Sequence, residues 1–273
     1  MKNAVIFSVT VLIVTWCYAW FIFSKPETVQ YYVFSMFIPA TVALIINSLR
    51  YRSVKQVFRP VTHPLNFRSI LFSFFYPVVF IGFVALCVYL LGIAEFNPEK
   101  LSNLTHYPSL EVVLIGSLLM FGEEYGWRGF LLKEIAEVKG KIFAAMAVGV
   151  VWALWHCPMV YGLANITQME NPLLLTIIQM GAVFVFSVPF AYSFFISGNI
   201  LPPMLFHFVW NYYNPIVLGN IYQNQPGILE GSMVLINGEG LAGIILGIIF
   251  IVWYIHHYKK RNVKIQNLRR TTK

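Results

Sequence analysis

The sequence predicts an all-α fold: a polytopic transmembrane helix bundle of about eight spans, forming a single domain over residues 1–273. Three observations support this fold class. Of the 273 residues, 58% are hydrophobic and 11% are charged, with a mean hydropathy of +0.69, whereas soluble domains carry about 25% charged residues. Apolar runs long enough to cross a bilayer recur along the chain. Lys and Arg residues gather in every second connection between those runs.

Eight apolar runs of about 20 residues each predict the individual helices, since this length crosses a hydrocarbon core of ~30 Å. They lie at 4–23, 30–49, 69–93, 111–131, 142–161, 173–197, 201–219 and 240–257. The third and sixth runs contain Pro77 and Pro189, where kinks are expected. The first run is longer than the apolar part of a typical signal peptide, and no small-residue cleavage site follows it. We therefore expect it to be retained as the first span.

The distribution of Lys and Arg predicts the orientation of the bundle. If the N-terminus is cytoplasmic and the connections alternate, all of the 19 basic residues except Lys25 and Lys100 lie inside. The inside residues are Lys2 and those within 50–68, 128–141 and 259–273. This is the positive-inside pattern. It predicts a multi-pass protein of the cell membrane with both termini in the cytoplasm.

The net charge of +8 is explained by this orientation. No basic face interleaved with aromatic residues occurs in a soluble module, so nucleic acid is not expected as a partner. The basic tail, residues 259–273, is expected mainly to anchor the last span at the cytoplasmic surface, with binding of anionic headgroups as the alternative. The cysteines Cys17, Cys87 and Cys157 show no metal or redox spacing. The lipid bilayer is thus one partner, and the sequence sets no oligomeric state.

The fourth apolar run contains two adjacent carboxylates and an arginine. Ionisable groups at membrane depth cost roughly 3 kcal/mol each on insertion scales, so such residues indicate a functional site. Glu124 and Arg128 are four residues apart on one helix face and are expected to pair. One arginine leaves one carboxylate uncommitted, which we expect to be Glu123. Gly122 and Gly126 form a small-xxx-small pair that permits close approach of a neighbouring helix.

Two further runs carry polar side chains that lipid alone does not explain. His156 lies in the fifth run, four residues after Trp152. In the seventh run, His207 and Asn211 are four residues apart on one face, as a pair of hydrogen-bond donors for an oxyanion would be. Each residue alone has a structural explanation, either interhelical hydrogen bonding or a helix clasp. Together they favour an active or transport site in a core that spans residues 111–219.

These motifs, Glu123-Glu124-x-x-x-Arg128, Trp152-x-x-x-His156 and His207-x-x-x-Asn211, in this order, resemble those of the CPBP family of intramembrane endopeptidases. This family includes the CAAX-processing type II protease and bacterial proteins once called abortive-infection proteins. The sequence departs from the family pattern at Trp152, where the second motif usually has Phe. The change keeps an aromatic ring and was expected to matter little.

The resemblance implies metal-independent hydrolysis of a peptide bond by a glutamate-activated water. By position, Glu123 would be the general base, and His156 would help to bind the water. His207 and Asn211 would stabilise the oxyanion, while Glu124 and Arg128 would support the site. No cofactor is expected, but two histidines and a glutamate are also ligands that catalytic zinc uses, so a zinc protease is the minority alternative. Helix lengths counted from the span ends place Glu123 and His207 ~12 and ~9 Å from the cytoplasmic end but His156 ~21 Å from it, so the count leaves the depth of His156 open. A cavity that faces the cytoplasm is nevertheless expected.

Two other functions remain open from the sequence. A non-catalytic scaffold or bacteriocin-immunity factor of the same fold would bind a peptide without cutting it. A proton-coupled transporter would use the Glu and His residues as a relay, but it predicts inverted repeats that the sequence does not show. The expected partner is a peptide or small membrane-protein substrate, and the residues do not identify which one.

Overall fold

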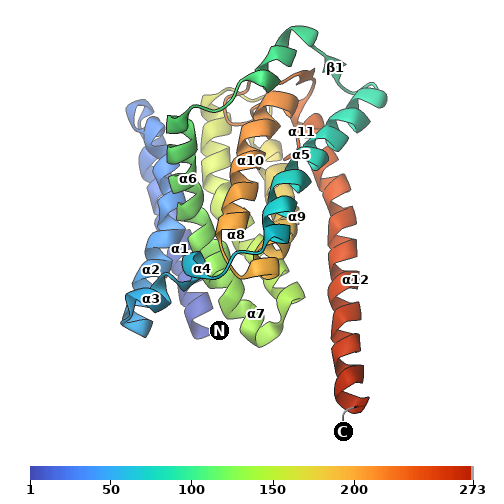
Figure 1. Ribbon diagram of the computed structural model, residues 1–273. Helices are drawn as coiled ribbons and strands as arrows, with labels where there is room; N and C mark the ends of the chain where they lie inside the picture. The colour runs from blue at the N-terminus through green and yellow to red at the C-terminus, as the bar shows by residue number, and fades with distance from the viewer. Residues whose placement is uncertain (272–273) are drawn as a thin grey trace.

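The computed structural model describes the backbone of residues 1–271 and the side chains of residues 1–260. It is a bundle of long helices with almost no sheet (Figure 1), so the all-α polytopic prediction is confirmed. The first half contains α1 (Lys2–Phe23), η1 (Pro26–Met36), α2 (Phe37–Tyr51), α3 (Val54–Val57), α4 (Arg59–Thr62), α5 (Phe67–Leu90), β1 (Glu95–Phe96) and η2 (Pro98–Thr105). The second half contains α6 (Leu110–Glu124), η3 (Tyr125–Leu132), α7 (Lys133–Lys139), α8 (Lys141–Ile166), α9 (Pro172–Ser197), α10 (Leu201–Leu218), β2 (Leu229–Glu230), α11 (Met233–Ile236) and α12 (Leu241–Thr271).

The two ends of the bundle differ. The N-terminus and the C-terminal end of α12 lie at the end that carries α3, α4 and α7 (Figure 1). We call this the basic end because these three helices contain Lys55, Arg59, Lys133 and Lys139. At the opposite end, β1 pairs with β2 in an antiparallel two-stranded sheet close to α11, and we call this the sheet end. The strand pair was not predicted, because two residues per strand give no periodic pattern. The predicted basic tail lies, from residue 261 onward, outside the residues whose side chains are described.

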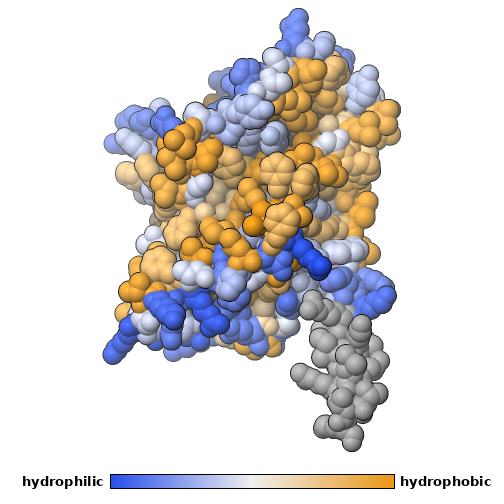
Figure 2. Space-filling model, in the orientation of Figure 1, coloured by the Kyte–Doolittle hydropathy of each residue, from blue (hydrophilic) through white to orange (hydrophobic). Residues whose placement is uncertain are grey.

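The outer helices bury one narrow stripe and expose apolar side chains elsewhere. In α1, the buried residues include Phe7, Val11 and Ile22, whereas Val5 and Ile13 are more than half exposed. A helix of a water-soluble protein would place polar residues on that outer face. Hydrophobic residues cover much of the middle of the visible face, and hydrophilic residues gather mainly towards its ends (Figure 2). The outer apolar surface is therefore suited to contact with lipid.

Six helical segments of the described chain are long and apolar enough to cross a membrane. They are 2–23, 26–51, 67–90, 141–166, 172–197 and 233–260, and a seventh is added if η2 and the helix from Leu110 to Lys139, bent by 82° relative to each other, count as one span. The predicted span at 201–219 corresponds to α10, which is not among them. The polar residues His207, Asn211 and Asn214 lower the mean hydropathy of α10. All three line an internal cavity, which explains why polar side chains occur in this helix. The number of eight spans stays a prediction.

Candidate active site

The two adjacent carboxylates end α6. The chain continues without a break into η3, a π-helical segment in which every residue is buried. π-Helical turns are rare, and they occur frequently at functional sites. The 2% exposed Glu123 and the fully buried Glu124 thus lie in the interior of the bundle.

Two glycines permit close packing beside the carboxylates. A Cβ atom on Gly122 would lie 2.5 Å from the carbonyl oxygen of Met36, and one on Gly126 would lie 2.5 Å from Cβ of Pro39. Any larger residue would push the junction of η1 and α2 away from α6. The close approach predicted from the small-xxx-small pair is confirmed, and its partner is this junction.

Two indole groups hold the carboxylate of Glu123. Its Oε2 atom accepts hydrogen bonds from Nε1 of Trp152 at 2.9 Å and from Nε1 of Trp127 at 3.3 Å. Within the described residues, Oε1 has no hydrogen-bond partner, and Glu123 lines a cavity. One oxygen of this carboxylate is therefore fixed, and the other is available to a bound molecule.

Glu124 makes a different set of contacts and does not line the cavity. Its Oε1 atom accepts a hydrogen bond from Nη1 of Arg128 at 2.9 Å, the pairing that the sequence spacing predicts. The same oxygen lies 2.9 Å from Nδ1 of His207, so Glu124 joins α10 to the arginine of η3. Arg128 is fully buried, and its guanidinium stacks on the rings of Trp152 and Phe190 at 4.1 and 4.4 Å. Such cation–π contacts stabilise a desolvated cation.

The histidine of α8 has a defined tautomer. Nδ1 of His156 lies 3.0 Å from the carbonyl oxygen of Trp152, and a carbonyl oxygen can only accept. Nδ1 must therefore carry the hydrogen, and Nε2 of the neutral ring is left as an acceptor. This nitrogen can accept a hydrogen bond from water.

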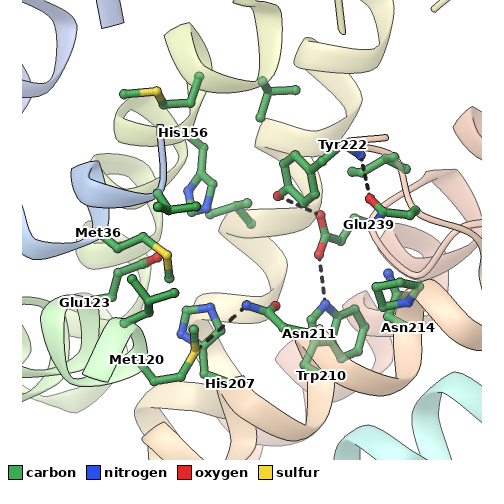
Figure 3. A pocket seen from close by; sticks show the side chains of 18 of the residues that line it. Met36, Met120, Glu123, His156, His207, Trp210, Asn211, Asn214, Tyr222 and Glu239 are labelled. Atoms are coloured by element: carbon green, nitrogen blue, oxygen red, sulfur yellow. Dashed lines mark hydrogen bonds between the residues drawn. The ribbon is translucent and has the colours of Figure 1, made fainter. Parts of the chain in front are cut away.

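The cavity joins the side chains predicted from the three separate motifs. It has a volume of about 350 Å³, and Glu123, His156, His207 and Asn211 all line it. Figure 3 shows these side chains converging on the same space from different helices. Asn211 donates only a weak hydrogen bond, 3.8 Å long, to the sulfur of Met120, so its amide is not firmly committed elsewhere.

The cavity lies on the sheet-end side of the carboxylates. Its walls follow α10 from His207 to Pro215 and α6 back from Glu123 to Val112, and they include the loop residues 219–223. All of these segments lead toward the sheet end (Figure 1). The expectation that the cavity would face the basic, predicted cytoplasmic end is wrong. Counting helix lengths gives the depth of each residue, but it cannot say on which side packing leaves space.

Sequence reasoning missed several residues of this site. Trp127 receives no role from the sequence, and Trp152 is included only as the aromatic residue of the second motif, although an indole N–H is a donor that normally finds a partner when buried. Glu239 was missed because its loop is polar and lies outside the predicted spans. In the structure Glu239 lines the cavity opposite Glu123, as Figure 3 shows. Within the described residues, no group of three His, Cys, Asp or Glu side chains is arranged to hold a metal ion.

The fold and the cavity define a multi-pass membrane protein with paired carboxylates and histidines in its interior. Residues 105–213, about two fifths of the chain, match the family described as type II CAAX prenyl endopeptidase Rce1-like. This match confirms the resemblance seen in the three motifs. All six predicted site residues lie within the matched segment, and Glu239 lies beyond it. No curated protein matches the chain.

Proposed function

We propose that this protein is an intramembrane, glutamate-dependent and metal-independent endopeptidase that hydrolyses a peptide bond at or within the membrane. One observation supports this proposal above all: Glu123, which accepts its two indole hydrogen bonds through Oε2 alone, lines a cavity that is also lined by His156, His207 and Asn211. The Rce1-like match supports a peptide as the substrate class. The substrate is a peptide or a small membrane protein.

In this mechanism a water molecule lies between Glu123 and Nε2 of His156. Glu123 removes a proton from the water, and the resulting hydroxide adds to the carbonyl carbon of the scissile bond. The carbonyl oxygen then becomes an oxyanion that His207 and Asn211 stabilise by donating hydrogen bonds. Collapse of the tetrahedral intermediate breaks the C–N bond, and Glu123 returns its proton to the leaving amine.

The contact between His207 and Glu124 determines which protonation state of His207 can stabilise the oxyanion. If Nδ1 donates to Glu124, then Nε2 can donate to the oxyanion only when the ring carries both protons. A carboxylate at Nδ1 stabilises that charged ring. We therefore assign Glu124 the role of holding and charging His207, in addition to neutralising Arg128.

The test is cleavage of a quenched fluorescent peptide library by the purified full-length protein in detergent, with and without a strong zinc chelator. Chelator-resistant cleavage supports the proposal. Cleavage that the chelator abolishes and zinc restores would instead identify a metalloprotease. If no peptide of the library is cut and a co-expressed native membrane peptide also survives intact, the endopeptidase proposal is wrong and a binding scaffold takes its place.

We further propose that the chain is one domain with eight spans in the cell membrane and both termini in the cytoplasm. Both termini lie at one end of the bundle, which requires an even number of crossings (Figure 1). Six apolar helices and the bent segment give up to seven, and we propose α10 as the eighth. Under the positive-inside rule the basic end is cytoplasmic, and the cavity then lies toward the opposite side of the membrane.

This topology predicts opposite labelling of two exposed sites. In a background with Cys17, Cys87 and Cys157 replaced by alanine, Glu99→Cys in η2 should react with a membrane-impermeant maleimide on intact cells. Lys55→Cys in α3 should react only after lysis. Both native side chains are exposed, so access to reagent is the only difference between them. The reversed pattern would contradict the orientation, and labelling of both sites on intact cells would show that α5, the helix between them, does not cross the membrane.

Trp152→Phe tests the indole hydrogen bond to Glu123 and restores the residue usual in the family. Hydrogen bonds to charged groups contribute about 1.5–3 kcal/mol. If part of this energy orients the general base, kcat should fall about tenfold, with little change in KM. Trp155→Phe is the matched control, because it removes an indole of the same helix whose Nε1 has no hydrogen-bond partner. An equal loss of kcat in both variants would show that ring size, rather than the N–H group, matters.

A further inference from the structure

A second carboxylate lines the cavity on the wall opposite Glu123. Glu239 lies in the loop between α11 and α12, and its side chain reaches the cavity beside Asn211 and Trp210 (Figure 3). The proposed chemistry does not use it. Its position outside the matched family segment also means that the comparison gives it no role.

Neutral donors alone surround this carboxylate among the described residues. Oε1 accepts a hydrogen bond from Nε1 of Trp210 at 2.9 Å. Oε2 accepts one from Nε2 of Gln179 at 2.9 Å and one from the hydroxyl of Tyr222 at 3.3 Å. Burial, together with the nearby Glu239 charge, raises the pKa of Tyr222 well above its ordinary value, so this hydroxyl keeps its proton and donates it. A carboxylate has about four acceptor positions, and these three bonds leave capacity for another donor.

The loop that carries Glu239 is firmly held. Asn237 is fully buried. Its amide donates to the carbonyl oxygens of Leu218 and Gly219 at 3.1 and 2.6 Å, and its Oδ1 accepts from the backbone N–H of Glu239 at 2.8 Å. A Cβ atom on Gly238 would lie 2.4 Å from Oδ1 of Asn214, so this stretch packs directly on α10. The carboxylate is therefore fixed in place before any ligand binds.

The cavity has an uncompensated negative charge. Its described lining contains the carboxylates Glu123 and Glu239 but neither Lys nor Arg. The buried cation Arg128 does not line the cavity and is already paired with Glu124. Even with His207 charged, the three carboxylates Glu123, Glu124 and Glu239 exceed the cations Arg128 and His207 by one. A desolvated charge is costly unless an opposite charge pairs with it.

We propose that Glu239 is an anionic subsite that binds a cationic group of the peptide substrate, either a Lys or Arg side chain or a free N-terminal amine. The ring of Trp210, with that of Phe186 4.2 Å away, forms an aromatic wall beside the carboxylate. Such a wall packs against the alkyl part of a basic side chain and attracts its charge. This inference deepens the proposed peptidase function, and it names the specificity of the same cavity.

The test measures binding separately from cleavage. Full-length protein carrying Glu123→Gln, which is expected not to cleave, is titrated with three pools of octapeptide amides. The first pool is N-acetylated with Lys at one position, and the second is identical except that norleucine replaces Lys. The third carries norleucine and a free N-terminus. We expect the first or the third pool to bind at least tenfold more tightly than the second, which distinguishes a side chain from a terminal amine as the ligand.

Adding Glu239→Gln should remove this preference and leave binding of the norleucine pool unchanged. Glu230→Gln, which neutralises a half-buried carboxylate of β2 that pairs with Lys100 outside the cavity, should keep the preference. Glu239→Asp retains the negative charge and should keep most of the preference. This result would show that loss of the charge, and not loss of the fold, removes the preference in Glu239→Gln.

Equal affinity for the three pools would overturn the subsite, and so would a preference that survives Glu239→Gln. Neither result bears on whether the wild-type protein cuts peptides. Conversely, absence of cleavage in the library assay would leave the preference measurable, so the failures of the two proposals are distinguishable.

Discussion

Replacing Glu123 by glutamine should lower kcat for peptide cleavage by about a thousandfold. General acid–base catalysis typically contributes 10²- to 10⁴-fold, and the amide of glutamine cannot remove a proton from water. The substitution keeps the size of the side chain and an oxygen that can accept from Trp152 and Trp127. Folding and substrate affinity should therefore change little. The measurement is kcat and KM on the best library peptide, together with the midpoint of thermal unfolding in detergent.

The matched control for this experiment is Glu111→Gln. Glu111 lies in the first turn of the same helix, is exposed and does not line the cavity. It should leave kcat within twofold of the wild-type value. Retention of more than a tenth of wild-type activity in Glu123→Gln would rule out Glu123 as the base. If both variants lost activity together with thermal stability, the effect would belong to α6 as a whole.

The parts of the site that the sequence predicted are those set by local spacing or by the cost of polarity in lipid. Glu124 and Arg128 pair because residues four apart share a helix face. His156 and His207 meet Glu123 in one cavity because isolated polar side chains in apolar helices have to find one another or water.

The contacts that the sequence could not predict depend on how distant helices are rotated against each other. Spacing does not reveal that His207 reaches Glu124 rather than Glu123, since this follows from the packing of α10 against α6 and η3. The indole of Trp152 reaches Glu123 for the same kind of reason, across 29 positions of sequence.

Glu239 illustrates a further limit of hydropathy. A glutamate in a polar loop carries no energetic penalty by itself, so nothing in its neighbourhood distinguishes it from a solvated residue. Only the return of the loop onto α10, fixed by Asn214 and Asn237, brings it to the cavity. The same limit applies to the side on which the cavity lies, because empty space results from imperfect packing among all the helices.

Of the substitutions considered, Glu124→Gln should lower the free energy of unfolding most. Its neighbour Glu123, by contrast, is expected to affect catalysis and to contribute little to stability. Glu124 and Arg128 are both fully buried, and the one hydrogen bond recorded for Arg128 is to Glu124. Removing one partner of a buried ion pair costs about 3–5 kcal/mol, because the other charge is left uncompensated. The stacked rings of Trp152 and Phe190 offset part of that cost. The measurement is unfolding of the purified protein in detergent.

A second substitution separates this structural role from the role in catalysis. The double variant Glu124→Gln/Arg128→Met removes both members of the buried ion pair and leaves neither charge without the other, so it should recover much of the stability lost in the single variant. Its activity should stay low, because His207 then lacks the carboxylate at Nδ1. Glu134→Gln breaks the partly exposed pair with Arg50 and serves as the control, with an expected loss of about 1 kcal/mol or less. Recovery of activity along with stability would show that Glu124 only neutralises Arg128, and that His207 is positioned by something else.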